Sequence, residues 1–183
     1  MKSEKSNKET LVVLDFENVD IGLRNKKRKW IGELNDWVNN TFNPIRKVVF
    51  LDSQRVNGKR AFLDKCNWFI HDVVTREKDI DGNQLVLNNA VDIELAMYTM
   101  DYAYRNDVDR VVLISGDGDY ASLVNYLRRM HIRVEVVSLL KCLSVKLNDA
   151  ADDIYYLELI LDLIDQENHI ETGNPRIAIK VVS

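Results

Sequence analysis

Short, continuous apolar runs are the feature that most limits how this chain can fold. Runs of this length are typical of strands that are buried on both faces of a parallel sheet. We expect such strands at Leu11–Phe16, Lys47–Asp52, Trp68–Thr75, Arg110–Ser115 and Arg133–Ser138. A sheet of this kind needs helices on each of its faces, and the segments between the runs have to provide them.

Between the runs, apolar residues recur at intervals of three and four, which is the spacing of one helix face. In one such segment the spacing joins Ile93, Met97, Met100 and Tyr104 into a single face. The predicted helices cover Trp30–Val38, residues 59–67, Val91–Tyr104, Tyr120–Met130 and Asp152–Ile164. Because strand and helix alternate throughout, we predict a three-layer α/β/α sandwich with a mainly parallel sheet and right-handed crossovers.

Two segments fall outside this alternation. Arg76–Gln84 is polar and contains Gly82, so we expect an exposed loop that contacts substrate. Pro175–Ser183 alternates apolar with other residues, as an added edge strand would. Docking on a neighbouring subunit of a homodimer and a frayed terminus are open alternatives. The expected domain limits are a polar N-terminal tail at 1–10, one domain at 11–165 and a C-terminal extension at 166–183.

Composition narrows the possible functions. Of 183 residues, 46% are hydrophobic and 30% are charged, which favours one domain with a substantial core over a disordered chain. The 25 Lys and Arg residues against 29 Asp and Glu residues give a net charge of −4, so any nucleic-acid site must be local. Cys66 and Cys142 belong to no CxxC pair, which argues against zinc and against a disulfide framework.

Location is predicted from the same features. Two isolated cysteines fit a reducing compartment. The polar start of the chain has no apolar signal region, and no stretch approaches the roughly 18 apolar residues of a membrane span. We therefore expect a cytoplasmic protein with no membrane association.

Acidic residues follow the predicted strands at the points where those strands end. Ligands of open parallel sheets bind beyond the carboxyl ends of the strands. Here that edge carries Asp15 after the first run, and Asp117 and Asp119 after the run at 110–115. Asp92, at the start of a predicted helix, can face the same edge. Asp119 also suits the N-cap position of the helix that follows it.

Four carboxylates that converge on one edge repel one another, and each raises the pKa of the others unless a cation neutralises them. Oxygen ligands without a nearby Cys or His favour Mg²⁺ or Mn²⁺ over Zn²⁺. We therefore predict a divalent metal held by Asp15, Asp92, Asp117 and Asp119. Such a metal orients and deprotonates water and stabilises the charge that builds on a phosphodiester.

Basic residues follow the same strand ends and give this acidic chain a local positive rim. Lys and Arg residues gather at 24–29, at 55–60 and at 76–78, each group beyond a predicted strand. We expect the rim to hold a polyanion around the acidic centre, with nucleic acid as the partner. The predicted substrate contacts are Arg24, Lys26, Lys27, Arg28, Arg55 and Lys59, with Tyr120 as the one aromatic side chain placed to meet a substrate.

Three segments resemble the NYN domain, in the LabA-like (DUF88) branch of the PIN-like nuclease superfamily. They are LVVLDFENVD at 11–20, AVDIELAMYTMDYAYRND at 90–107 and VVLISGDGDYASLVNYLRRMHIRVEVVS at 111–138. The resemblance runs from about Leu11 to Leu157. It implies a PIN-like sandwich and metal-dependent ribonuclease chemistry.

The resemblance also implies roles for single residues. Asp15 would be the first metal ligand and Asn18 would shape the same pocket. Asp92 would be the acid carried by a helix, and Asp117 and Asp119 would complete the centre. Ser115 would form a hydrogen bond near the strand end, on the substrate side. The catalytic set is then Asp15, Asn18, Asp92, Asp117 and Asp119.

Two positions depart from the family pattern. Many NYN domains carry a Lys where Asn89 stands and a second Asp where Tyr98 stands, and Asp101 is a candidate replacement for that Asp. These departures keep a second hypothesis open, a weak or inactive NYN module that binds RNA or regulates. Toprim and haloacid dehalogenase sites are minor alternatives, because Asp15 stands where the first expects Glu and Glu17 stands where the second expects Asp.

Overall fold

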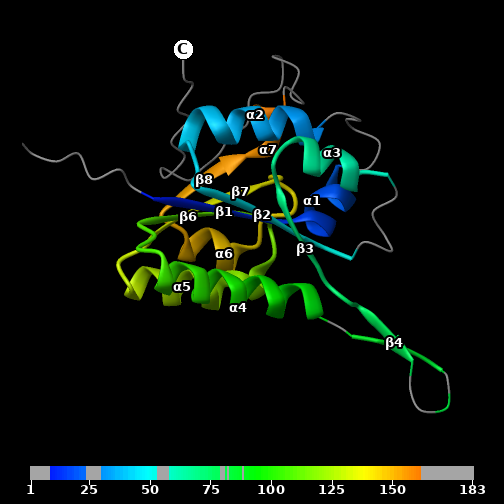
Figure 1. Cartoon of the computed structure of the whole chain (residues 1–183). Coiled ribbons are helices and arrows are strands. Elements are labelled where there is room, and N and C mark those ends of the chain that lie inside the picture. Colours follow the sequence, from blue (N-terminus) through cyan, green and yellow to red (C-terminus); the bar gives the residue numbers. More distant parts are fainter. Residues whose placement is uncertain are drawn as a thin grey trace, which may run out of the picture.

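A six-stranded parallel sheet in the order β3-β2-β1-β6-β7-β8 forms the centre of the molecule (Figure 1). The computed structural model describes residues 9–23, 30–52, 58–78, 81, 83–87 and 89–161. The sheet strands are β1 (Thr10–Asp15), β2 (Arg46–Leu51), β3 (Phe69–Asp72), β6 (Arg110–Ile114), β7 (Arg133–Ser138) and β8 (Asp153–Tyr156). All five runs that the sequence marks as strands are confirmed, with ends that shift by a few residues.

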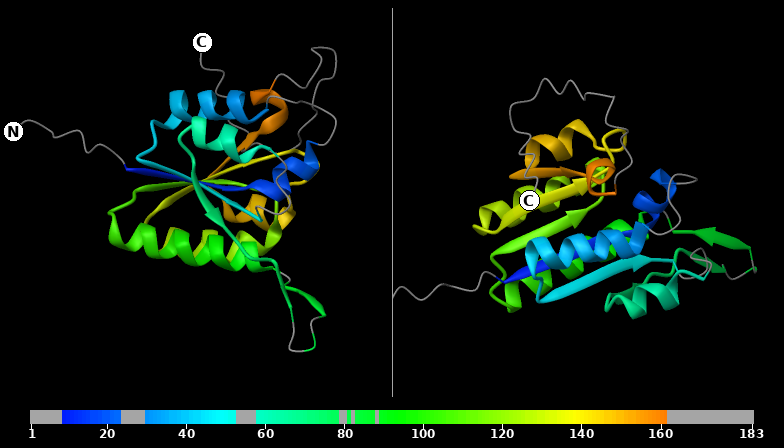
Figure 2. Two further views of the ribbon diagram at one scale, coloured as in Figure 1. Left: turned by 45° about the vertical axis from the view of Figure 1, so that its right-hand side comes forward. Right: turned by 90° about the horizontal axis from the view of Figure 1, so that it is seen from above.

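Helices cover both faces of the sheet, which confirms the three-layer α/β/α sandwich (Figures 1 and 2). The helices are α1 (Phe16–Gly22), α2 (Trp30–Phe42), α3 (Arg60–Lys65), α4 (Ala90–Arg105), α5 (Ala121–Arg129), α6 (Val145–Ala150) and α7 (Leu157–Ile160), with a short 3₁₀ turn, η1 (Gly118–Tyr120). α2, α3 and α7 lie on one face, and α4, α5 and α6 lie on the other.

Each layer of helices closes a separate apolar core, and strand β1 contributes to both. Leu11 and Val13 face the core beneath α4 and α5, whereas Val12 and Leu14 face the core beneath α2. Successive side chains of a strand point to opposite faces, so a strand covered on both sides needs apolar residues at every position. This requirement explains the continuous apolar runs in the sequence.

The order of the strands creates a crevice at one edge of the sheet. From β1 the chain continues to β2 and β3 on one side, and from β6 it continues to β7 and β8 on the other. Leu14 of β1 pairs with Ile114 of β6, so both strands end at the same level. Ligands of parallel sheets bind at such a reversal point, and this one lies between the two strands that precede the acidic motifs.

The predicted loop at 76–84 is wrong in part. Arg76–Lys78 (β4) and Gln84–Val86 (β5) form an antiparallel hairpin that projects away from the sheet (Figure 1). The Asp-Gly pair at 81–82 is a typical hairpin signal, and the apolar residues of the second strand lie just beyond the segment that we assigned to the loop.

The predicted helix at 152–164 is also wrong at its start. Asp153–Tyr156 is strand β8, which pairs with β7 from Glu135 to Ser138, and only the short helix α7 follows it. Ile and Tyr residues pack well on a pleated surface, and their spacing here also fits a helix. Residues 162–164, like the possible edge strand at 175–183, lie outside the described residues.

Helix α4 buries a different face from the predicted one. Its buried side chains are Leu95, Thr99 and Ala103, whereas Ile93, Met97 and Tyr104 of the predicted face are 55%, 59% and 78% exposed. Both stripes have helical spacing. The buried stripe is less obvious because it contains a polar residue, Thr99, whose hydroxyl donates to the Leu95 carbonyl at 2.7 Å.

Two further features complete the fold. Helix α6 has no counterpart in the sequence prediction; it begins after Ser144, whose hydroxyl accepts a hydrogen bond from the Leu147 amide at 3.1 Å. Cys66 and Cys142 are both free thiols. No helix among the described residues is long and apolar enough to cross a membrane.

Candidate metal centre at the carboxyl edge of the sheet

Asp15 ends strand β1 and is held by two hydrogen-bond donors, with the Tyr120 hydroxyl close to it. Its Oδ1 accepts from the Asn18 amide at 3.2 Å, which caps helix α1. Its Oδ2 accepts from the Ser115 hydroxyl at 3.3 Å and lies 3.3 Å from the Tyr120 hydroxyl. Asp15 is only 5% exposed, and this burial, with a smaller contribution from the charge of Asp92, raises its pKa to about 6. The neighbouring Asn18 amide and the Ser115 and Tyr120 hydroxyls lower the pKa and so act in the opposite direction.

Asn18 joins the loop after β1 to the loop after β6. Its Oδ1 accepts a hydrogen bond from the Gly116 amide at 3.0 Å. Gly116 fits only because it has no side chain: a Cβ there would lie 2.3 Å from the Cys142 carbonyl oxygen. The paired loops therefore hold the two acidic motifs at a constant separation.

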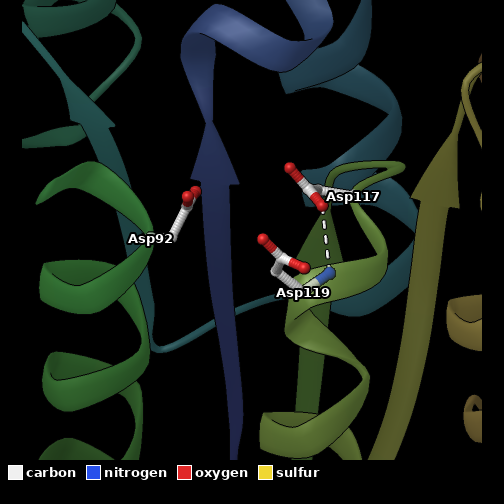
Figure 3. Close-up of side chains that lie close together, drawn as sticks. All are labelled: Asp92, Asp117 and Asp119. Carbon is white, nitrogen blue, oxygen red and sulfur yellow. Dashed lines mark hydrogen bonds between the residues drawn. The ribbon is translucent and has the colours of Figure 1, made fainter. Parts of the chain in front are cut away.

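Asp117 and Asp119 lie in the turn that leads from β6 into α5. The Asp117 amide donates to the Ser115 hydroxyl at 3.2 Å, and Asp117 Oδ1 accepts from the Asp119 amide at 3.0 Å (Figure 3). Asp117 is thus the N-cap of η1, and the N-cap role predicted for Asp119 is wrong. Tyr120 occupies the N-cap position of α5 without a side-chain cap bond. The Asp119 carboxylate is exposed instead.

Three carboxylates meet across the crevice. Asp92 from α4, Asp117 and Asp119 each offer one oxygen, and these oxygens lie within 4.8 Å of one another (Figure 3). Burial and the charges of Asp117, Asp119 and Glu17 raise the pKa of Asp92, against a hydrogen bond from Tyr120. This set of hard oxygen donors suits a divalent cation, which would remove the repulsion between them.

Tyr120 lies between the buried carboxylate and this group. Its hydroxyl donates to Asp92 Oδ1 at 2.8 Å and lies 3.3 Å from Asp15 Oδ2, and its side chain is 1% exposed. Burial, followed by the two carboxylates, raises the pKa of Tyr120. The sequence predicts substrate contacts for Tyr120 and Ser115, but both are buried and their hydroxyls contact carboxylates. Their position makes them supports of the acidic side chains.

A cavity of about 250 Å³ opens over these groups. The hairpin contributes its end at Val86 and Leu87, and α4 contributes its first turn. The polar residues that line it are Asp15, Glu17, Asn18, Thr75, Asn89, Asp92 and Asp117. A small polyanionic group can therefore approach the carboxylates only in the company of a neutralising cation.

The sequence profile of the NYN domain matches residues 9–159, which include every element from β1 into α7. The chain belongs to the NYN domain family. This family lies within the PIN-like nuclease superfamily.

Among solved structures, the NYN fold recurs in a protein of unknown function from Vibrio parahaemolyticus. The two chains superpose with a TM-score of 0.62 at 22% identity, over 85% of this chain and 96% of that one, which shows a shared fold. MurG from Acinetobacter baumannii aligns with a TM-score of 0.49 at 10% identity, over 81% of this chain and 41% of that one, too low to support an argument. No curated protein matches the chain.

The positions that depart from the NYN pattern lie in different environments. Asn89 precedes α4 in a left-handed backbone conformation, with φ of 60°, and lines the cavity. Tyr98 stacks on Tyr102, with 5.7 Å between the ring centroids, and packs against the core. Asp101 is exposed and pairs with Arg105 at 2.7 Å, so it does not replace the missing carboxylate.

Most of the predicted basic rim falls on residues that are not described. Arg24, Lys26, Lys27, Arg28 and Arg55 lie outside the described residues. Lys59 forms an ion pair with Asp20, which also accepts from the Trp30 indole at 3.3 Å. A substrate contact by Lys59 stays a prediction and requires this pair to open.

One pair at the same edge escaped the sequence prediction. Asp52 directly follows β2, is 3% exposed and accepts a hydrogen bond from the Thr75 hydroxyl. Thr75 lines the cavity beside the hairpin. The rule that pointed to Asp15 and Asp117, namely that residues just beyond strand ends meet at one edge, would have found Asp52 as well.

Proposed function

We propose that the protein is a metal-dependent nuclease that hydrolyses phosphodiester bonds in RNA, with Mg²⁺ or Mn²⁺ held by Asp92, Asp117, Asp119 and Asp15. The observation that carries the proposal is the meeting of these carboxylates at the reversal point of the sheet, with oxygens of three of them within 4.8 Å. The raised pKa of Asp15 and of Asp92 indicates that their negative charge is poorly tolerated without a cation.

The carboxylates of the site have two different roles. Asp92, Asp117 and Asp119 present accessible oxygens, and Asp15 adds a carboxylate whose orientation Asn18, Ser115 and Tyr120 maintain. A divalent cation bound there supplies a polarised water and stabilises the negative charge that develops on the phosphate. Water is the nucleophile, so no covalent intermediate with the protein is expected.

A second candidate is an NYN module that binds RNA with little turnover. Asn89 favours it, because a neutral side chain lines the cavity where many NYN domains carry a Lys. Without that cation, less charge is available to attract and stabilise a phosphate. Asn89 is exposed, so Asn89→Lys tests this candidate without disturbing the core. A gain of cleavage in Asn89→Lys would identify the missing cation as the cause of weak turnover.

The main test is cleavage of labelled RNA in Mn²⁺, in Mg²⁺ and in EDTA. Asp117→Asn is expected to lower the rate at least about 100-fold, because it removes a carboxylate on which charge stabilisation depends. Asp101→Asn is the matched control: it makes the same chemical change at an exposed residue outside the crevice and should cleave like the wild type.

Each other outcome has a distinct meaning. Equal rates for the wild type and Asp117→Asn would contradict the nuclease proposal. RNA binding without cleavage in any metal would favour the binding module. Cleavage of single-stranded DNA but not of RNA would overturn the choice of substrate.

A further inference from the structure

An apolar groove between α4 and α5 continues from the acidic crevice. Its volume is about 470 Å³, within the usual range of ligand sites. The residues that line it are Asn89, Asp92, Ile93, Ala96, Met100, Asp119, Tyr120, Ser122, Leu123, Tyr126 and Arg129. Asn89 and Asp92 also line the cavity over the carboxylates, so the groove and the candidate metal centre share one mouth.

The walls of this groove expose apolar surface that the core does not use. Ile93 is 55% exposed and Tyr126 is 41% exposed, although Leu95 and Leu123 on the same helices are buried. Exposed apolar surface that forms a continuous groove usually marks a binding site. The tyrosine ring offers a flat face of the kind on which nucleobases stack.

A cation lies at the far end of the groove. Within the part of the chain that the structure describes, Arg129 forms no ion pair, and its guanidinium lies 5.8 Å from the centre of the Tyr126 ring. Helix α5 has 9 residues and is therefore about 13 Å long. This length matches about four stacked nucleotides at a rise of 3.4 Å each.

We infer that the α4–α5 groove binds the bases of single-stranded nucleic acid that leads to or from the cleaved bond, an inference that rests on the proposed function. Along the groove the carboxylates come first, then apolar walls with an aromatic ring, and then the Arg129 guanidinium, which forms no ion pair among the described residues. A single strand matches this order: a phosphate meets the cation held by the carboxylates, unpaired bases pack on the walls, and a further phosphate meets Arg129.

A double helix does not match the groove. Its bases are stacked and paired inside the duplex and present only their edges, so they cannot cover Ile93 and Tyr126. The groove therefore gives the site a preference for unpaired strands that the carboxylates alone do not provide.

Binding of a short fluorescein-labelled single-stranded RNA, measured by fluorescence anisotropy in Ca²⁺ and in EDTA, tests this inference without depending on cleavage. Gel analysis afterwards checks that the RNA is intact. Tyr126→Ala is expected to raise Kd about tenfold, the size of one lost base-stacking contact, and Tyr126→Phe should bind like the wild type. Arg129→Gln is expected to weaken binding and to reduce its dependence on salt.

Tyr104→Ala is the matched control, because Tyr104 is a 78% exposed tyrosine on α4 that does not line the groove. It should bind like the wild type, and a blunt duplex of the same sequence should bind more weakly than the single strand. Equal Kd values for the wild type and Tyr126→Ala, or no binding by the wild type, would overturn the inference. So would equally tight binding of the duplex, or conversion of a dimer to a monomer by Tyr126→Ala in sedimentation velocity.

The two proposals can fail separately. If Asp117→Asn cleaves RNA as fast as the wild type while Tyr126→Ala binds it more weakly, the nuclease centre is wrong and the groove stands. If Asp117→Asn abolishes cleavage while Tyr126→Ala binds and cleaves like the wild type, the groove is wrong and the centre stands.

Discussion

The buried and the exposed carboxylates of the site are held in different ways. Asp15 is 5% exposed, and its two oxygens face donors from Asn18, Ser115 and Tyr120. Asp119 is exposed, and its own backbone amide donates to Asp117. The protein therefore builds a rigid base at the ends of β1 and β6 and places a rim of accessible oxygens on top of it.

This difference separates two requirements of a metal site. The base has its geometry whether or not an ion is bound, because hydrogen bonds from two loops define it. The rim brings like charges together, and that arrangement becomes favourable only with a cation. Substitutions in the base should therefore change folding and ligand orientation, whereas substitutions in the rim should change chemistry.

The largest effect on stability is expected from Gly116→Ala, which would break the base. The new Cβ would lie 2.3 Å from the Cys142 carbonyl oxygen, and backbone atoms cannot move away as a side chain can. We expect a loss of about 3 kcal/mol in the free energy of unfolding, measured by urea denaturation.

Gly32→Ala is the control for this substitution. Its Cβ would make an ordinary contact with Phe62 at 3.4 Å inside helix α2, so it should be neutral or stabilising by up to about 1 kcal/mol. If Gly116→Ala unfolds at the same urea concentration as Gly32→Ala, the tight packing of the two loops is not what holds the base together.

The base was largely predictable from the sequence, and the residues that support it were not. Residues 11–14 of β1 and 111–114 of β6 are all apolar and buried, and the rule that ligands meet beyond strand ends brings Asp15 and Asp117 together. That Tyr120 is buried under these carboxylates follows from the direction in which η1 enters α5. This direction depends on tertiary packing, which a single sequence does not display.

The exposed face of α4 is a second feature that depends on tertiary packing and that the sequence pattern does not predict. Ile93, Met97 and Tyr104 have the spacing of a core-facing stripe, but the sheet is covered by Leu95, Thr99 and Ala103. Periodicity predicts that a helix has an apolar face and does not say which of two such faces meets the sheet. Of the face left over, Ile93 lines the groove proposed above, whereas Met97 and Tyr104 do not.

An intermediate effect on the free energy of unfolding is expected from Asp15→Asn in the absence of metal. The pKa of Asp15 is about 6 in the folded protein and 3.8 as its ordinary value, so the ionised form is disfavoured by folding. The stability that this group contributes is complete below pH 3.8 and is lost as pH rises through about 6. The difference between these pKa values corresponds to about 3 kcal/mol in favour of an uncharged side chain at pH 7. The Asn amide nitrogen cannot accept a hydrogen bond from the Ser115 hydroxyl, which costs about 1 kcal/mol. At pH 7 in EDTA, Asp15→Asn should therefore be more stable than the wild type by about 2 kcal/mol.

The stability difference between Asp15→Asn and the wild type should also depend on pH. The advantage of Asp15→Asn should shrink as pH falls from 7 to 4, because the wild-type carboxylate then takes up a proton. Thermal unfolding of both proteins across this range in EDTA measures it, with Asp101→Asn as an exposed carboxylate control. A stability difference that does not vary with pH would show that the burial of Asp15 does not set its titration.

The smallest effect is expected from Tyr120→Phe, which tests whether the base orients the rim. Tyr120 is 1% exposed, and its hydroxyl connects Asp92 with Asp15, so the substitution removes that link and leaves the ring in place. Loss of a hydrogen bond to a ligating carboxylate typically weakens metal affinity about tenfold. Mn²⁺ affinity, measured by calorimetry, should fall by that factor, while the free energy of unfolding in EDTA should change by only about 1 kcal/mol.

Tyr126→Phe is the control: it removes a hydroxyl from a partly exposed tyrosine of the groove and should leave Mn²⁺ affinity unchanged. If the two variants bind Mn²⁺ equally well, the accessible carboxylates keep their orientation without the hydrogen bond from Tyr120. The buried base would then have no role in metal binding.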